Sequence, residues 1–210
     1  IEAKLPDPRP LIHVCDRHDY VDELTEYLHI NDLKKYVEVY VTKVSPAKTP
    51  QVVGKLLDLQ ANEDFIKNLI NSVGQMCPAP ELVEHVERRN RLKLIMPWLE
   101  ARVAQGNQET AVHNAVGKIY ISMNRDPLNF LQTNQFYDPM EIGKYCEKLD
   151  PHLAFVAYKG DKTNATDPEI VRVCQDNGLF KDLARYLVER QDEALWKSVL
   201  KPEGRSEEHT

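Results

Sequence analysis

PELVEHVERRNRLKLIMPWLEARVAQG, residues 80–106, is the stretch that decides the fold. Its second half predicts a helix with two apolar sides, because apolar residues recur there at helical spacing on two adjacent stripes. One stripe comprises Leu92, Ile95, Met96, Leu99 and Val103, and the other comprises Leu94, Trp98 and Ala101. A helix with two apolar sides needs neighbours on both, as in the middle of a layered stack. An ordinary buried helix of any all-α protein fits this stretch equally well.

Pro97 and Gly106 define the expected ends within this stretch. Proline lacks an N–H and crowds the carbonyl four residues earlier, so we expect either a kink at Pro97 or a new helix with Pro97 in its first turn. Gly106 supplies a residue that can adopt a left-handed conformation after the last helical turn. The stretch therefore predicts two consecutive helices with no strand between them.

Similar signals recur on both sides of this stretch, where capping residues and prolines precede apolar runs of helical spacing. Before residue 80, the first predicted helix spans Arg9 to Arg17, with Pro10 in its first turn. The residues expected to cap the following helices are, in order, Asp19, then Asn31 or Asp32, then Thr49 with Pro50 after it, and Asn62. The predicted starts after Gly106 are Glu109 and the pairs Asp126-Pro127, Asp138-Pro139, Asp150-Pro151 and Asp167-Pro168. Lys159 to Thr166 is expected to be a long, solvated and mobile loop.

About fourteen short helices follow from these signals, with very short turns and no alternating segment. Short antiparallel helices in sequence order stack as hairpins, so the predicted fold class is an all-α solenoid, an elongated rod in which each unit touches only its neighbours. A radius of gyration near the ~17 Å of a compact chain of this size would contradict that shape.

A modest internal echo supports a repeat. Positions of one segment recur at an offset of 146 residues, the separation of Asn31 from Asn177. The first set is Asn31, Leu33, Lys35, Val37, Tyr40 and Val41, and the second is Asn177, Leu179, Lys181, Leu183, Tyr186 and Leu187. The echo predicts a large repeat of several hairpins, with the end of one copy and most of the next in this chain.

Composition narrows the function classes. Of the 210 residues, 42% are hydrophobic and 29% are charged, and the formal net charge is −6. A chain of this length and composition can bury a hydrophobic core. Interspersed acidic and basic residues argue against the basic stripe that nucleic-acid binding needs. No apolar run approaches the ~20 residues of a membrane span, and residues 1–10 lack the pattern of a signal peptide. We therefore expect a cytosolic chain, or a piece of one, that does not insert into membranes.

The residues that could support chemistry form no recognisable motif. The steps between His13, Cys15 and His18 scatter these side chains around a helix, and no Cys-x-x-Cys pair is present, so we expect no metal site. Neither a phosphate-binding glycine motif nor a serine nucleophile elbow occurs. We therefore predict no catalytic residue and no cofactor. The other histidines and cysteines considered, which are given no role, are His29, His85, His113, His152, Cys77, Cys146 and Cys174.

Charged and aromatic residues have plainer interpretations. We expect Glu81, Glu84 and Glu87 to form a solvated helix face rather than an acid/base pair. The basic run Arg88, Arg89 and Arg91 is expected to form salt bridges and to aid solubility, with lateral contacts as a further possibility. Five aromatic residues at helical spacing are expected to be core rather than a ligand cage: Trp98, Tyr120, Tyr145, Tyr186 and Trp196.

Four segments of the chain closely resemble the clathrin heavy-chain family, in the distal part of its leg. They are PRPLIHVCDRHDYVDEL at residues 8–24, VERRNRLKLIMPWLEARV at 86–103, AVHNAVGKIYI at 111–121 and IGKYCEKLDPHLAFVAY at 142–158. The resemblance extends from Asp7 to Leu200. It departs from the family in the loop Lys159 to Thr166, which is longer and more polar than the usual turn.

The resemblance implies that residues 1–77 are the C-terminal part of one heavy-chain repeat and that residues 78–210 are most of the next. It also implies a non-enzymatic scaffold whose partners are other heavy-chain legs in the lattice of coated vesicles and coated pits, on their cytosolic face. Trimerisation, light-chain binding and adaptor binding are implied for other parts of the heavy chain, so no functional residue carries over. A helical-repeat adaptor of another trafficking complex is the alternative, followed by the helical domain of an enzyme.

Overall fold

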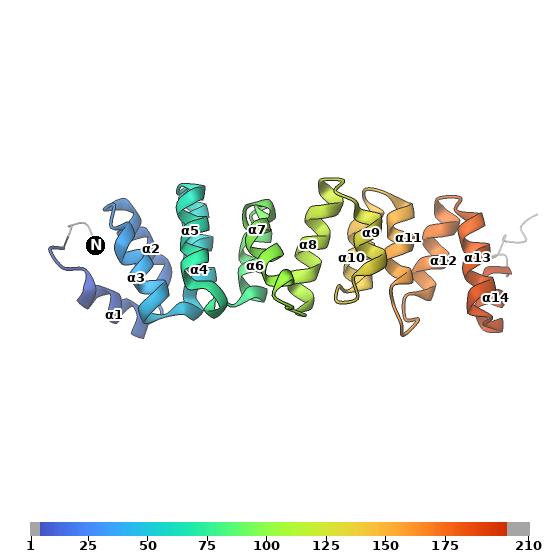
Figure 1. The fold of residues 1–210 in the computed structure, drawn as a ribbon, viewed down its shortest axis with the longest axis horizontal. Coiled ribbons are helices and arrows are strands. Elements are labelled where there is room, and N and C mark those ends of the chain that lie inside the picture. The colour runs from blue at the N-terminus through green and yellow to red at the C-terminus, as the bar shows by residue number, and fades with distance from the viewer. Residues whose placement is uncertain (1–4, 201–210) are drawn as a thin grey trace, which may run out of the picture. The chain divides into compact units, whose positions relative to one another are not determined.

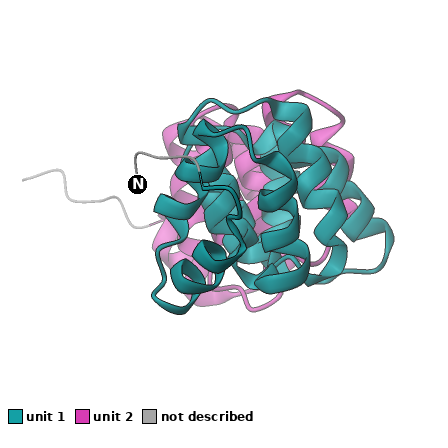
Figure 2. Cartoon of the chain, turned by 90° about the vertical axis from the view of Figure 1, so that its left-hand side faces the viewer, with its two compact units in different colours: residues 1–119 teal, residues 120–210 magenta. Residues whose placement is uncertain are grey.

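The computed structural model describes residues 5–200, and all regular secondary structure in that range is helical. It contains fourteen α-helices, so the predicted all-α class and the predicted number of helices are confirmed for this part of the chain (Figure 1). The chain divides into two compact units, residues 1–119 and 120–210, with the boundary inside α8 (Figure 2).

The helices are short, and turns of a few residues join most of them. In the first unit they are α1 Arg9–Arg17, α2 Val21–Ile30, α3 Lys34–Val39, α4 Thr49–Asp58, α5 Glu63–Val73, α6 Ala79–Glu87 and α7 Met96–Ala104, with α8 Thr110–Ser122 crossing the boundary. In the second unit they are α9 Pro127–Thr133, α10 Pro139–Glu147, α11 Pro151–Lys159, α12 Asp167–Asp176, α13 Phe180–Arg190 and α14 Glu193–Leu200. A π-helical turn, Tyr40–Val44, extends α3.

The first unit is a sequential stack of helix hairpins. α2 packs on α4 and α4 packs on α6. α3 packs on α2, and its π-helical extension Tyr40–Val44 contacts α5. α5 also contacts α4 and the 3₁₀ turn Leu92–Ile95. The residues between α2, α4 and α6 are almost completely buried: Leu24, Leu28, Val52, Val53, Leu56, Leu82 and Val86. α4 thus buries one side against the preceding hairpin and another against the following one.

The second unit is built around α11. This helix packs on α10, α9 and α12, and α12 packs on α13. α10 and α11 approach closely because Gly143 has no side chain, and the ring of the fully buried Tyr158 occupies the space beside it. Ala154, Ala157 and Ile142 complete a core with no exposed surface.

The stretch over residues 80–106 folds mostly as predicted. α6 ends at Glu87, a 3₁₀ turn follows over Leu92–Ile95, and α7 begins at Met96 with Pro97 in its first turn. Of the two alternatives for Pro97, the new helix is therefore the right one. Gly106 has φ +84°, which confirms the left-handed residue after α7. The second stripe was wrong at one position, because Ala101 is exposed.

Most of the residues before position 80 that were predicted to cap a helix do not do so. Asn62 does cap α5, accepting the Phe65 N–H at 3.0 Å. Asp19 and Asp32 instead have positive φ, so each closes the turn before its helix and does not cap it. Asn31 donates back to the Tyr27 carbonyl of α2. Thr49 is the first residue of α4, and its hydroxyl donates to the Pro46 carbonyl.

The Asp-Pro pairs all stand at helix starts, but their aspartates differ in role. Asp138 and Asp150 cap α10 and α11, each accepting from two backbone N–H groups. Asp126 precedes α9 in a left-handed conformation and makes no capping bond. Asp167 lies inside the first turn of α12, behind Thr166.

Local structure follows the sequence echo at offset 146. The offset maps α2 onto α12 and the start of α3 onto the start of α13. Asn31 and Asn177 each donate Nδ2 to the carbonyl four residues earlier, at 2.9 Å in both cases. Asp32 and Gly178, which follow them, both have positive φ. The two segments are therefore the same kind of hairpin.

The loop between α11 and α12 is exposed over residues 162–165, as predicted, but internal hydrogen bonds organise it. The Asp161 carboxylate accepts from the Thr163 N–H and hydroxyl and from the Thr166 N–H. Thr166 is buried, and its hydroxyl donates to the Tyr158 carbonyl at 2.8 Å. The prediction of a solvated loop is thus right for its tip and wrong for Thr166.

Candidate functional site: the interfaces between successive hairpins

Three polar contacts at matching positions join α2 and the turn before it to α4 and its N-cap residue. Asp19 pairs with Lys48, Asp22 accepts from Gln51 Nε2 at 3.1 Å, and Glu26 pairs with Lys55 at 2.6 Å. The two residues of each contact are 29 apart in sequence. A constant offset along both helices means that α2 and α4 run parallel, in a single register, with the polar contacts flanking the apolar interface.

The interface between α4 and α6 combines a close approach with a strong ion pair. Arg89 donates through Nε and one terminal nitrogen to the two Asp58 oxygens, at 2.7 and 2.6 Å. That hydrogen bond lowers the pKa of Asp58. Gly54 permits the approach, because a Cβ there would lie 2.6 Å from His85 Nδ1.

His85 is held in a setting that disfavours its charged form. Its Nδ1 atom is buried and has no hydrogen-bond partner. Burial, followed by the nearby Arg89 and Arg88, lowers the pKa of His85 below its ordinary value of 6.5. Glu84 and Asp22 act in the opposite direction without reversing it. The α4–α6 interface therefore favours the neutral form of the His85 imidazole.

Two further ion pairs link later segments of the first unit. Arg91, after α6, pairs with Glu63 at the start of α5 at 2.9 Å. Lys118 of α8 pairs with Glu87 of α6 at 2.5 Å, and the Lys118 side chain is only 11% exposed. Its low exposure makes this pair less screened than the others.

In the second unit a carboxylate joins three helices. Glu147, at the end of α10, accepts from the Tyr158 hydroxyl of α11 and from Arg172 of α12, the latter at 2.6 Å. Arg172 also pairs with Glu169 on its own helix at 2.6 Å. Burial would raise the pKa of Glu147, but the hydrogen bonds from Tyr158 and Arg172 outweigh it, so the pKa is lowered.

A second carboxylate ties α12 to α13. Asp167 is buried, accepts from the Tyr186 hydroxyl, and pairs with Arg190 at 2.9 Å. A buried carboxylate is stable only when paired and hydrogen-bonded, and both conditions are met here. Burial, followed by this hydrogen bond, raises the pKa of Tyr186.

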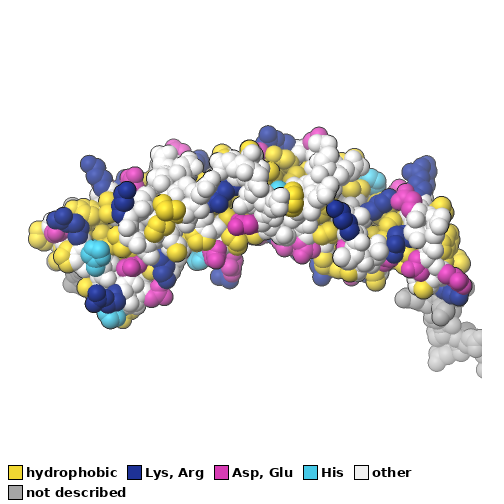
Figure 3. Space-filling view, turned by 60° about the horizontal axis from the view of Figure 1, so that its bottom comes forward, with side chains coloured by type: hydrophobic (Ala, Val, Ile, Leu, Met, Phe, Trp, Pro, Cys, Tyr) yellow, Lys and Arg dark blue, Asp and Glu magenta, His cyan; other side chains and the backbone are white. Residues whose placement is uncertain are grey.

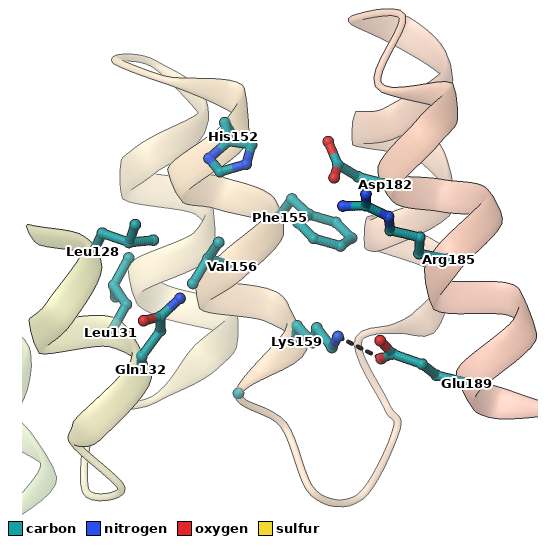
Figure 4. A pocket seen from close by; sticks show the side chains of 11 residues that line it. Leu128, Leu131, Gln132, His152, Phe155, Val156, Lys159, Asp182, Arg185 and Glu189 are labelled. Atoms are coloured by element: carbon teal, nitrogen blue, oxygen red, sulfur yellow. Dashed lines mark hydrogen bonds and ion pairs between the residues drawn. The ribbon is translucent and has the colours of Figure 1, made fainter.

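A groove of about 460 Å³ lies between α9, α11 and α13 of the second unit (Figure 4). Its apolar floor is made of Leu128, Leu131, Phe155 and Val156. Charged and polar side chains stand at the rim: His152, Lys159, Asp182, Arg185 and Glu189. Lys159 and Glu189 form an ion pair between α11 and α13 (Figure 4).

Comparison with known proteins assigns the family. A family model described as a region in clathrin and VPS matches residues 70–202. The chain belongs to this clathrin and VPS family.

Its curated relatives include clathrin heavy chains of distant organisms. The chain is 60% identical over 199 residues to the clathrin heavy chain of Dictyostelium discoideum, 55% identical to that of Drosophila melanogaster, and 51% identical to clathrin heavy chain 2 of Homo sapiens. Each match covers 95% of this chain and 12% of the relative. The chain thus spans about an eighth of the length of these relatives. They give no support to the alternative of an adaptor from another trafficking complex.

The clathrin-family fold separates the histidines and cysteines that the sequence left without a role. Within residues 5–200, no group of three His, Cys, Asp or Glu side chains could hold a metal ion. All four cysteines are buried free thiols, and burial raises the pKa of Cys77 and Cys146 to about 12. His113 Nε2 bonds the Asn107 carbonyl at 2.8 Å, and His152 lies at the groove. The absence of catalytic, cofactor and metal sites stays a prediction.

The charged residues of the deciding stretch are more structural than expected. All three arginines form salt bridges as predicted, with Glu84, Asp58 and Glu63 as partners of Arg88, Arg89 and Arg91. The expectation of a merely solvated glutamate face was wrong for Glu87, which is half-buried and pairs with α8. Sequence reasoning missed that role because the partner lies 31 residues away.

The aromatic residues are core to different degrees. Trp98 and Tyr186 are buried, and the Arg102 guanidinium lies 4.5 Å from the Trp98 ring centroid. Tyr120 and Tyr145 are half-buried. The prediction that Trp196 is a core residue was wrong, because its side chain is only half-buried. The same holds for its helix, since no described residue of α14 is buried.

None of the helices in the described range is both long enough and apolar enough to span a bilayer.

Proposed function

We propose that this chain is a structural segment of a clathrin heavy chain, part of the leg that assembles into the polyhedral coat of coated vesicles and coated pits. One observation carries the proposal. Identity of 51–60% to clathrin heavy chains runs along 95% of the chain. A non-enzymatic role in endocytosis and intracellular transport follows from that assignment.

The mechanism we propose is mechanical. An apolar seam and flanking ion pairs hold each hairpin against the next, as between α2 and α4. Cooperative burial makes each unit resist bending, whereas single exposed charges contribute little to contacts with other legs. Many weak lateral contacts together give a lattice that is stable and can still be taken apart. The mixed acidic and basic surface supports this kind of contact (Figure 3).

We further propose a repeat boundary after Cys77. Residues 1–77 would be the C-terminal part of one heavy-chain repeat and residues 78–210 most of the next. The break between α5 and α6, where Pro78 precedes α6, supports this boundary, as does the hairpin echo at offset 146. The boundary between the two compact units lies inside α8 and separates two sets of helices that pack mainly among themselves. It is a different kind of boundary from the end of a sequence repeat.

The proposed partners are other heavy-chain legs, on the cytosolic face of coated membranes. Trimerisation, light-chain binding and adaptor binding are assigned to regions outside this segment, and no nucleic acid is expected. In keeping with that assignment, acidic and basic side chains are interspersed on the visible face (Figure 3).

A segment exchange tests the proposal. In Dictyostelium cells lacking their own heavy chain, the 199 matched residues of the Dictyostelium heavy chain are replaced by those of this chain. We expect the chimera to restore coated pits, seen as clathrin puncta at the plasma membrane, and uptake of a fluid marker. The matched control carries Leu56→Asp, which puts a charge at a fully buried position of α4 and should abolish the rescue.

The outcome that contradicts the proposal is specific. A chimera that accumulates as heavy-chain trimers at normal levels but forms no puncta would show that this segment lacks the leg function. Should the isolated chain instead bind short peptides while the chimera fails, the adaptor alternative would be favoured.

A further inference from the structure

In the first unit, the ion pairs described above that join successive hairpins share a polarity. Between α2 and α4, Asp19 and Glu26 lie on the earlier side and Lys48 and Lys55 on the later side. Each contact therefore has its acid on the hairpin that comes first in the chain and its base on the hairpin that follows.

The same order recurs at other interfaces of both units. The acid precedes the base in the pairs Glu63–Arg91, Asp58–Arg89, Glu87–Lys118 and Glu147–Arg172. Lys159–Glu189, which borders the groove between α11 and α13, has the opposite order. The helix dipole explains acids before bases within one helix, but it does not order charges between two parallel helices.

We propose that this polarity selects the order and register in which the hairpins stack. A hairpin presents bases toward its predecessor and acids toward its successor, so head-to-tail stacking joins opposite charges and pairing of like faces joins equal ones. Exposed pairs contribute little to stability, but their arrangement discriminates against wrong partners. This inference goes beyond the proposed coat function, because it concerns how the segment itself is assembled.

Position 55 shows that the charges act as a face and not as isolated pairs. Lys55 Nζ is 2.6 Å from Glu26, and its pKa is raised first by that partner and then by Asp22 and Asp58. A base at position 55 is thus favoured by three carboxylates on two helices. An acid placed there would meet Asp22 and Asp58 even if residue 26 were made basic.

A charge exchange in the full 210-residue chain tests the proposal. The variants are Glu26→Lys, Lys55→Glu and the double variant, compared by thermal unfolding at low salt. We expect each single reversal to lower the midpoint by roughly 2–4 °C, and the double variant to recover only part of the loss. The deficit should shrink in about 0.5 M salt, where exposed charges are screened.

The matched control is the pair Glu193–Lys197 within α14, whose side chains are 82% and 67% exposed. Exchanging these two charges should leave the midpoint nearly unchanged, since both residues lie on one helix and are largely exposed. Full recovery in the Glu26→Lys/Lys55→Glu variant would overturn the proposal, because isolated pairing would then suffice. Single reversals that leave the midpoint unmoved at low salt would overturn it as well.

Discussion

Gly143 offers the sharpest test of the packing in the second unit. A Cβ at this position would lie 2.2, 2.4 and 2.5 Å from three ring atoms of Tyr158, whereas ordinary contact begins at 3.4 Å. The ring would therefore have to move by about 1 Å. It cannot do so easily, because Tyr158 has no exposed surface and its hydroxyl is hydrogen-bonded to Glu147.

The expected effect of Gly143→Ala is the difference between two opposing terms. Overpacking of a rigid core costs up to about 3 kcal/mol, and the better helix propensity of alanine returns about 1 kcal/mol. We expect the free energy of unfolding to fall by about 2 kcal/mol. Urea unfolding followed by hydrogen exchange of peptides from α10 and α11 measures that change in the unit concerned.

A second substitution separates the clash from other causes. In a Tyr158→Ala background the whole ring is absent, so Gly143→Ala should be neutral or stabilising by up to about 1 kcal/mol. The reasoning is refuted if Gly143→Ala is harmless in the native background. It is refuted equally if the same loss persists after Tyr158 has been shortened.

Three further changes probe other contacts. The pKa of His85 in the folded chain is lowered below 6.5, so just below that pH the unfolded chain binds more protons than the folded one. The free energy of unfolding should therefore fall as the pH is lowered from about 7.5 to about 5.5. The urea midpoint measures that fall, and His85→Gln should reduce it. Asp150→Ala should cost about 1 kcal/mol by removing a cap, whereas Asp126→Asn, at a position without one, should stay within about 0.5 kcal/mol in the same titration. Asp167→Ala should lower the free energy of unfolding by about 2 kcal/mol, because it leaves the buried Tyr186 hydroxyl without its acceptor, and Tyr186→Phe should lower it by less. Hydrogen-exchange protection of α12 and α13 measures both losses, and equal losses would contradict this account.

Sequence reasoning failed at the capping residues for a physical reason. Asp19, Asp32 and Asn62 all precede an apolar helical run, yet only Asn62 has the extended backbone that lets its side chain reach the first turn. An aspartate can equally adopt a left-handed conformation, as Asp19 does, and then its carboxylate is free to pair with Lys48. The choice depends on how tightly the preceding hairpin turns, which composition does not reveal.

The side-chain contacts between helices were beyond sequence reasoning for a different reason. Glu87 and Lys118 are 31 residues apart, and nothing near either residue marks its partner. Asp167 stands in an ordinary Asp-Pro start, but the packing of α12 on α13 turns it into a buried partner of Arg190. Pairing between helices is a property of register, and register becomes visible only when the helices are placed together.

The sequence by itself determined the helical class, the number of helices and most of their starts, because apolar spacing, proline and capping chemistry act within a few residues. It also determined the family, since identity to clathrin heavy chains extends along nearly the whole chain. Only the tertiary structure decided which carboxylates are buried, where Gly143 admits a ring, and which base faces which acid. These features arise between segments about 15 to 30 residues apart, where the distance between side chains depends on the packing of whole helices.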